Sequence, residues 1–143
     1  MIVLDTNVLS ALMLREPDSR VVTWLDRQPA DAIWTTSITV FEISFGLALL
    51  PAGRRRRNLE DAFARAIAED FEGRVLPFEE DAARNAAEQA ARRQLIGRRV
   101  DFRDVEVAGI VAVKDAILAT RNTRHFDGLG IQLIDPWKHR VGA

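Results

Sequence analysis

Short apolar runs alternate along the chain with longer stretches of helical periodicity, and this alternation constrains the fold more than any other feature. The runs predict five strands, at residues 2–4, 32–36, 74–76, 116–119 and 131–134. The helical stretches lie at residues 8–14, 21–25, 39–50, 59–71, 79–95 and 101–114. Strands joined through helices need crossover connections, so they form a mostly parallel sheet sandwiched by helices. The sequence therefore predicts one α/β domain, which spans residues 1–143.

Composition and charge exclude several classes of protein. Hydrophobic residues make up 48% of the chain, too many for an intrinsically disordered protein. The formal net charge is −1, so any contact with nucleic acid must be local rather than spread over a basic surface. Cysteine is absent, which excludes disulfides, thiol catalysis and zinc bound by cysteine. A metal ion would therefore need oxygen ligands or the two histidines.

The sequence shows no membrane or targeting segment. Its first residues are uncharged up to Asp5 and lack the basic region of a signal peptide. The longest apolar run, residues 43–50, is far shorter than the ~20 residues that a bilayer requires. We therefore expect a cytoplasmic protein that has no membrane partner.

Polar residues follow two of the predicted strands at the point where each strand ends. Asp5-Thr6-Asn7 follows the first strand, and Thr120-Arg121-Asn122 follows the fourth. Open parallel sheets bind ligands at the carboxyl ends of their strands. If the first and fourth strands are neighbours, these polar ends come close to Glu42 and Asp104 on the flanking helices.

Each acidic residue also has a purely structural interpretation. Asp5 is placed to cap the helix that follows it, and Asp101 is placed to cap the helix that carries Asp104. Glu42 lies in an apolar helical stretch, where a carboxylate costs several kcal/mol unless it pairs with an arginine or binds a metal. The residues alone leave the structural and the metal-binding interpretations open.

A joint site is more specific than any of its members. Two carboxylates repel each other by about 4 kcal/mol at about 4 Å for an effective dielectric constant of about 20. Three of them at one site therefore stay ionised only with a cation. Oxygen ligands favour a hard ion, which here means Mg²⁺ or Mn²⁺.

Five segments of the chain resemble the PIN-domain ribonucleases, specifically the VapC/FitB-like toxins of type II toxin–antitoxin pairs. These segments are Met1–Ser10, Ser37–Gly46, Gly73–Phe78, Leu118–Asn122 and Asp135–Trp137. They occur in the same order over nearly the whole chain. The resemblance implies a five-stranded parallel sheet and a Mg²⁺-dependent endoribonuclease, which hydrolyses RNA phosphodiester bonds with a metal-activated water.

The resemblance also implies roles for particular residues. The acids of the family match Asp5, Glu42 and Asp104, which are the expected metal ligands and catalytic residues. A fourth catalytic position, Asp in some members and Asn in others, matches Asn122. Residues expected to orient the carboxylates or bind substrate are Thr6, Asn7, Thr120 and Arg121.

Glu106 competes with Asp104 for the third acidic position. Two residues along a helix turn a side chain by about 200°, so only one of the two can face the site. The motif spacing favours Asp104, and Glu106 is then expected on the surface or toward a partner.

Partners follow from the same resemblance. The family implies a cognate antitoxin that blocks the acidic pocket, a homodimer or a toxin–antitoxin hetero-oligomer, and operator DNA bound only through the antitoxin. Two other functions remain open. One is a catalytically inactive module that binds a metal or an antitoxin. The other is an Asp-dependent phosphoryl-transfer domain, which Asn7 disfavours because such phosphatases carry a second Asp there.

Arginine supplies 18 of the 20 basic side chains, and two groups of arginines are candidate RNA contacts. One group is residues 54–57, and the other comprises Arg92, Arg93, Arg98 and Arg99. Either group could equally form a solvated face. His125 lies in a predicted loop, where it could touch the substrate, although a loop histidine without a role is the favoured interpretation.

Overall fold

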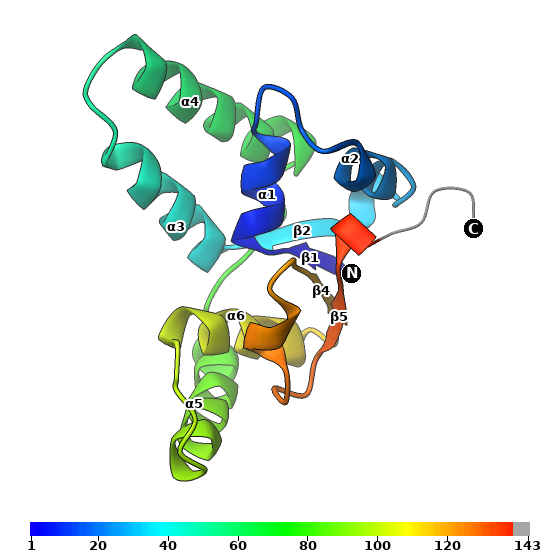
Figure 1. The fold of residues 1–143 in the computed structure, drawn as a ribbon, viewed down its shortest axis with the longest axis vertical. Helices are drawn as coiled ribbons and strands as arrows, with labels where there is room; N and C mark the ends of the chain where they lie inside the picture. The colour runs from blue at the N-terminus through cyan, green and yellow to red at the C-terminus, as the bar shows by residue number, and fades with distance from the viewer. Residues whose placement is uncertain (139–143) are drawn as a thin grey trace.

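Five short parallel strands form the centre of the computed structural model, which describes residues 1–138 (Figure 1). The strands are β1 (Ile2–Leu4), β2 (Ile33–Thr36), β3 (Val75–Leu76), β4 (Ile117–Ala119) and β5 (Gln132–Ile134), in the order β3-β2-β1-β4-β5. In register, Ile2 lies beside Ile33 on one side and Ile117 on the other. The predicted five-stranded sheet is confirmed, and residues 139–143 of the predicted domain lie outside the described part.

Helices separate most of the strands, as predicted. They are α1 (Thr6–Leu12), α2 (Ser19–Asp26), α3 (Ser37–Ala48), α4 (Arg54–Arg65), α5 (Glu80–Leu95) and α6 (Phe102–Val113). Short turns η1 (Ala30–Ala32), η2 (Ala66–Asp70), η3 (Thr123–Phe126) and η4 (Pro136–Lys138) complete the order. Within residues 1–138, none of the helices is long and apolar enough to cross a bilayer.

The helix α4 begins five residues earlier than the predicted start at residue 59. Its first four residues are arginines, which favour helices but carry no apolar periodicity that could reveal the start. The predicted helix extends to residue 71, and most of the part that lies beyond α4 is η2, which is a π-helical turn. The periodicity therefore located the buried part of this helix and missed its polar beginning.

Alternate residues of the central strands face two separate apolar cores. Val3 and Leu118 belong to the core under α5 and α6, whereas Leu4 and Ala119 belong to the core under α1–α4. Figure 1 shows these two groups of helices on opposite sides of the sheet. Because the strands are buried on both faces, they are short apolar runs without polar alternation.

One glycine allows α5 and α6 to pack closely. A Cβ atom at Gly109 would lie 2.5 Å from the backbone oxygen of Ala82 and 3.1 Å from the Cβ of Ala86. We expect Gly109→Ala to lower the free energy of unfolding by about 1–3 kcal/mol, because a backbone atom blocks the added methyl group. Urea denaturation of the purified protein measures this change.

The matched control is Gly46→Ala in α3, where an added Cβ meets nothing within 4 Å. There we expect a gain of up to about 1 kcal/mol, since alanine favours helices over glycine. Equal stabilities of the two variants would show that the close approach of α5 and α6 is not required.

The carboxyl ends of β1 and β4 lie side by side, and this adjacency positions the candidate site. The backbone N–H of Asp5 donates to the carbonyl of Ala119 at 3.0 Å. The first residue after β4, Thr120, donates its backbone N–H to the carbonyl of Ile134 at 2.9 Å. The two polar stretches predicted at the strand ends are therefore neighbours.

Candidate active site

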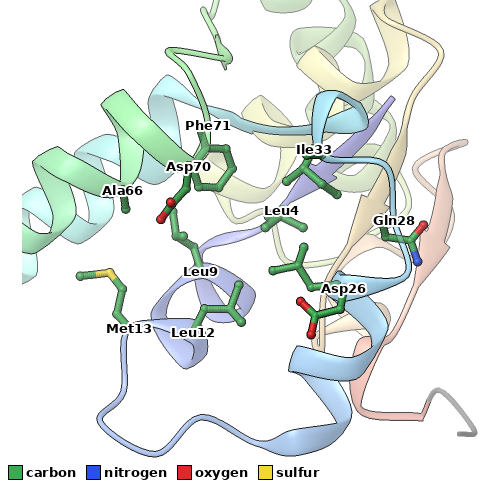
Figure 2. Close-up of a pocket in the computed structure, with 12 residues that line it drawn as sticks. Leu4, Leu9, Leu12, Met13, Asp26, Gln28, Ile33, Ala66, Asp70 and Phe71 are labelled. Carbon is green, nitrogen blue, oxygen red and sulfur yellow. The ribbon is translucent and has the colours of Figure 1, made fainter.

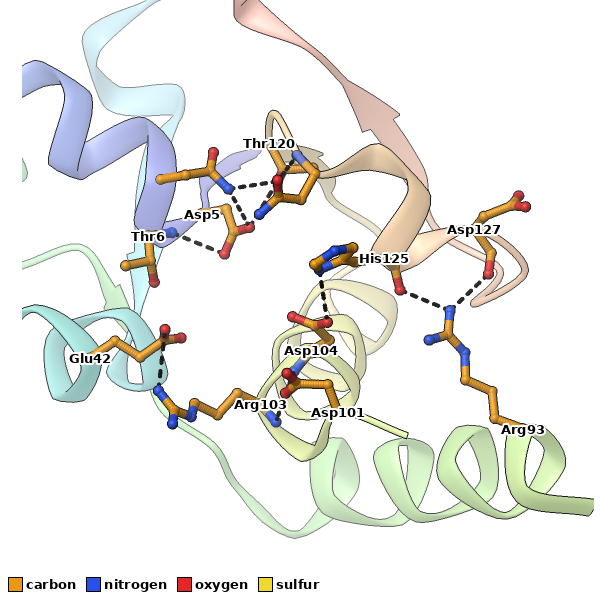
Figure 3. A network of polar contacts seen from close by, with 12 residues as sticks. Asp5, Thr6, Glu42, Arg93, Asp101, Arg103, Asp104, Thr120, His125 and Asp127 are labelled. Carbon is orange, nitrogen blue, oxygen red and sulfur yellow. Dashed lines mark hydrogen bonds and ion pairs between the residues drawn. The ribbon is translucent and has the colours of Figure 1, made fainter. Parts of the chain in front are cut away.

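Asp5 lies at the carboxyl end of β1, and three hydrogen bonds hold its carboxylate (Figure 3). Oδ1 accepts from the backbone N–H of Thr6 at 2.9 Å, and Oδ2 accepts from the hydroxyl of Thr120 at 2.8 Å and the amide of Asn7 at 3.2 Å. Asp5 is thus the N-cap of α1 as well as a candidate site residue. Burial raises the pKa of Asp5, and the hydrogen bonds offset part of that rise.

The stretch after β4 supports this carboxylate. The Asn7 amide also donates to the Thr120 hydroxyl at 3.1 Å, and that hydroxyl accepts from the backbone N–H of Asn122 at 3.1 Å. The backbone N–H of Arg121 donates to the side-chain oxygen of Asn7 at 3.0 Å, while its guanidinium lies 4.9 Å from the ring centre of Trp137. Asn122 contributes its backbone here, and its side chain is exposed.

Glu42 projects from α3 toward the same edge of the sheet and is about three-quarters buried, with 24% of its side chain exposed. Its nearest charged partner is Arg103, whose guanidinium lies 3.6 Å from the carboxylate. Burial raises the pKa of Glu42, the negative charge of Asp5 raises it further, and Arg103 lowers it. Glu42 therefore has the arginine partner that one of its two interpretations predicts, and the same carboxylate also interacts with Asp5.

Asp104 lies in the first turn of α6, whose N-cap is Asp101. Its carboxylate is 3.4 Å from Nδ1 of His125. Burial raises the pKa of Asp104 to about 6, the charge of Asp101 adds to this rise, and the charges of Asp5 and Glu42 add less. Asp104 is therefore electrostatically coupled to both of the other acids.

Figure 3 shows Asp5, Glu42 and Asp104 directed toward one another from β1, α3 and α6. Among residues 1–138, however, no group of three acidic or histidine side chains lies close enough together to coordinate one metal ion directly. The arrangement is an open anionic cluster. Mg²⁺ commonly uses one or two carboxylates and keeps several waters, so an open cluster of carboxylate oxygens fits such an ion.

Several proteins of known family are similar to this chain in sequence and in fold. A sequence model described as PIN domain matches residues 2–130. The chain belongs to the PIN-domain family. Its relatives include VapC ribonuclease Y4jK of Sinorhizobium fredii, 38% identical over 138 residues that cover 96% of this chain and 99% of the relative. Toxin FitB of Neisseria gonorrhoeae is 33% identical over 137 residues, with 96% and 99% covered.

A solved structure extends this comparison to three dimensions. The PIN domain aligns with FitAcB from Neisseria gonorrhoeae at a TM-score of 0.89 and 32% identity, covering 97% of this chain and 100% of the other. The resemblance noted in the sequence, and the fold that it implied, are both confirmed.

Two residues of the PIN domain have roles that differ from those expected. His125 was expected to have no role, yet it contacts Asp104 because the loop after β4 returns over the carboxyl edge of the sheet. Arg93 was a candidate RNA contact, and that prediction is wrong. It is buried, and its guanidinium donates to the carbonyls of His125 and Asp127, both at 2.8 Å. Arg93 thus fixes the loop that carries His125.

A separate cavity of about 390 Å³ lies between α1, α2 and η2 (Figure 2). Its walls are mainly apolar and include Leu9, Leu12 and Met13, with Asp26 and Asp70 also among its lining residues. It contains none of the predicted site residues. The candidate site residues of the PIN domain therefore lie outside this cavity, at the carboxyl edge of the sheet.

Proposed function

We propose that this PIN domain is a Mg²⁺- or Mn²⁺-dependent endoribonuclease, the toxin of a type II toxin–antitoxin system. The observation that carries the proposal is the coupling of Asp5, Glu42 and Asp104, three acids from separate elements, at one edge of the sheet. The similarity to VapC ribonuclease Y4jK and to toxin FitB supports the same activity.

In this proposal, Asp5, Glu42 and Asp104 hold the divalent ion, directly or through water. A bound ion of this kind neutralises phosphate charge, acidifies the attacking water and stabilises the transition state. Asp104 also has a pKa of about 6, which suits a carboxylate that accepts a proton near neutral pH. Arg121, beside the Asp5 network, is placed to contact a phosphate of the substrate.

Partners belong to the same proposal. We expect a cognate antitoxin to inhibit the enzyme, and the toxin to form a homodimer or a hetero-oligomer with the antitoxin. Operator DNA would then be bound through the antitoxin alone. Adding the purified antitoxin to a cleavage reaction should stop the formation of RNA products.

The experiment that tests the function is the sequencing of RNA ends after brief expression of the protein. We expect new internal ends to accumulate, and we expect none in cells that express Asp5→Ala at the same level. With purified protein, the same cleavage should require Mg²⁺ or Mn²⁺ and disappear with EDTA. Identical RNA ends from the two proteins would contradict the proposal.

A catalytically inactive binding module is the second candidate. It is favoured by one observation, that the carboxylates of Glu42 and Asp104 already have side-chain partners, Arg103 at 3.6 Å and His125 at 3.4 Å. Divalent-ion binding without any cleavage of RNA would support this alternative over the enzyme.

Thr120 is a positioning residue in this account, because it is fully buried and acts through Asp5. We expect Thr120→Val to lower kcat/KM for RNA by about 10–100-fold, the usual cost of losing a group that orients a metal ligand. The pKa of Asp5 should also rise, since the hydrogen bond that the variant lacks lowers it. The pH–rate profile of the variant should therefore shift toward higher pH.

Two further variants separate positioning from simple destabilisation. Thr120→Ser keeps the hydroxyl and should restore most of the activity. Thr35→Val makes the same change at another fully buried threonine, whose hydroxyl donates to the backbone carbonyl of Leu4 at 3.2 Å and not to a carboxylate. A loss of activity as large in Thr35→Val as in Thr120→Val would argue against the role of Thr120.

A further inference from the structure

A second cavity, of about 710 Å³, adjoins the acidic cluster, and arginines dominate its lining. Five of its ten lining residues are arginines, and two are aspartates. The cavity lies between the loop that joins α5 to α6 and the turn η3. We call it the arginine pocket, and the members that matter here are Arg98, Arg99, Phe102, Arg103, Arg124 and His125.

The arginine pocket opens directly onto the candidate active site. Asp104 lines the pocket and also belongs to the acidic cluster. His125, whose Nδ1 lies 3.4 Å from the Asp104 carboxylate, also lines the pocket, on the turn that Arg93 fixes through two backbone carbonyls (Figure 3). Arg103 lines the pocket and reaches Glu42. A ligand in the pocket would therefore lie beside Asp104 and beside the pair that Arg103 forms with Glu42.

Three guanidinium groups in the pocket have no compensating partner. Within the part of the chain that the structure describes, the side chains of Arg98, Arg99 and Arg124 make neither an ion pair nor a hydrogen bond. By contrast, Arg56 and Arg84 each pair with a glutamate one helical turn away. The pocket therefore concentrates positive charge beside an anionic cluster, in a chain whose net charge is −1.

An exposed aromatic ring completes the pocket. Phe102 is 69% exposed at the first position of α6, although its neighbours on that helix include several buried residues. Guanidinium groups bind phosphate oxygens with paired hydrogen bonds, and an exposed ring stacks on an unpaired base. Positive charge and an open ring together match a segment of single-stranded RNA.

We propose that the arginine pocket is a substrate subsite, in which Arg98, Arg99 and Arg124 bind backbone phosphate beside the scissile bond and Phe102 stacks on an adjacent base. This inference rests on the proposed ribonuclease function and names where its substrate lies. Single-stranded RNA is the expected ligand, because a duplex would keep its bases stacked on one another and away from the ring.

The test is the binding of a fluorescent, mixed-sequence single-stranded RNA at several salt concentrations, in EDTA so that no cleavage occurs. We expect the double variant Arg98→Ala/Arg99→Ala to weaken binding at low salt by at least about tenfold, because it removes two charged hydrogen-bond donors. The slope of log K against log salt should become shallower by up to about 1.4, because each phosphate that the variant leaves without a cationic partner accounts for about 0.7.

The control is Arg15→Ala/Arg65→Ala, which removes the same charge from two exposed arginines, one just after α1 and one at the end of α4. Figure 1 shows α1 and α4 on the side of the sheet opposite α6. We expect the control to bind RNA much as the parent does. Equal losses in the two double variants would overturn the proposal, since they would reflect net charge alone.

Phe102→Ala tests the stacking separately from the charge. We expect about fivefold weaker binding or more with an unchanged salt slope, because a stacked base contributes energy without releasing a counterion. Leu14→Ala, at another exposed apolar side chain, should leave binding unchanged. Unchanged binding in Phe102→Ala would remove the stacking from the proposal.

Cleavage with Mg²⁺ distinguishes failure of the subsite from failure of the function. In the Arg98/Arg99 double variant, we expect a higher KM for RNA and a nearly unchanged kcat. If the parent cleaves RNA and the double variant binds RNA as the control does, the subsite is wrong and the ribonuclease function stands.

Polyglutamate is the probe for an acidic protein segment. If the double variant loses binding of polyglutamate but not of RNA, the pocket binds an acidic protein segment and the RNA subsite is overturned. If RNA binding changes as expected but the parent never cleaves, the subsite stands and the function falls.

Discussion

Asp5→Asn should lower kcat/KM for Mg²⁺-dependent RNA cleavage by more than about a hundredfold. Removing a residue that merely orients a metal ligand already costs about 10–100-fold, so removing a ligand itself should cost more. The amide has nearly the shape of the carboxylate but lacks its charge, and its NH₂ group would face the Asn7 amide and the Thr120 hydroxyl where Oδ2 now accepts. Rates with and without Mg²⁺ measure the effect.

The stability of Asp5→Asn should stay near that of the parent. Burial disfavours the charge of Asp5, so removing the charge stabilises the fold, whereas removing a hydrogen-bond acceptor destabilises it. The matched control is Asp115→Asn, the same change at an exposed residue just before β4, whose φ of 49° asparagine also adopts. If folded Asp5→Asn cleaves RNA as fast as Asp115→Asn, the site is wrongly assigned.

Asp104→Asn should lose activity and gain stability. At neutral pH the parent keeps this carboxylate ionised in a buried position, near Asp101, Asp5 and Glu42. Asparagine removes this charge, and we expect the free energy of unfolding without metal to rise by on the order of 2 kcal/mol. Activity with Mg²⁺ should fall by more than about a hundredfold, for the reason that applies to Asp5.

The gain in stability should depend on pH in a defined direction. The pKa of Asp104 is about 6 in the folded protein, against an ordinary value of 3.8 for an aspartate. The folded state therefore holds an additional proton between these values, and the stability of the parent falls as the pH rises through them. The variant lacks this group, so its advantage over the parent should be complete above about pH 7 and vanish near about pH 4.

Thermal unfolding of the two proteins across this range, in EDTA, measures the difference. Asp5 and Glu42 titrate in both proteins, so the difference reports Asp104 and its electrostatic interaction with these two acids. A variant less stable than the parent at every pH would show that the pairing with His125 outweighs the burial of the charge.

The sequence predicted the sheet and indicated the edge of the sheet at which the acids lie. Strands buried on both faces appear as uninterrupted apolar runs, such as residues 2–4, and each run stops where a polar residue meets the edge of the sheet. Two such stops, at Asp5 and Thr120, revealed the edge where the acids meet. The adjacency of β1 and β4, predicted as one option, brings these stops together.

The remaining features depend on interactions between distant segments that leave no local pattern. Arg93 looked like its exposed neighbours on an alanine-rich helix, and only the return of the loop at His125 explains its burial. The pairing of Arg103 with Glu42 joins residues of α6 and α3, which no spacing in the sequence connects. The role proposed for Phe102 likewise depends on the position of the start of α6 at the wall of a cavity.

The binding of Mn²⁺ is the most direct test of the claim that Asp5, Glu42 and Asp104 form one cation site. Calorimetric titration should show binding by the parent and by Asp115→Asn, with an affinity that rises as the pH passes about 6 and Asp104 ionises. In Asp5→Asn, Glu42→Gln and Asp104→Asn, we expect the affinity to fall by at least about tenfold each. Parent-like affinity in all three variants would contradict the account, because the ion would then bind elsewhere.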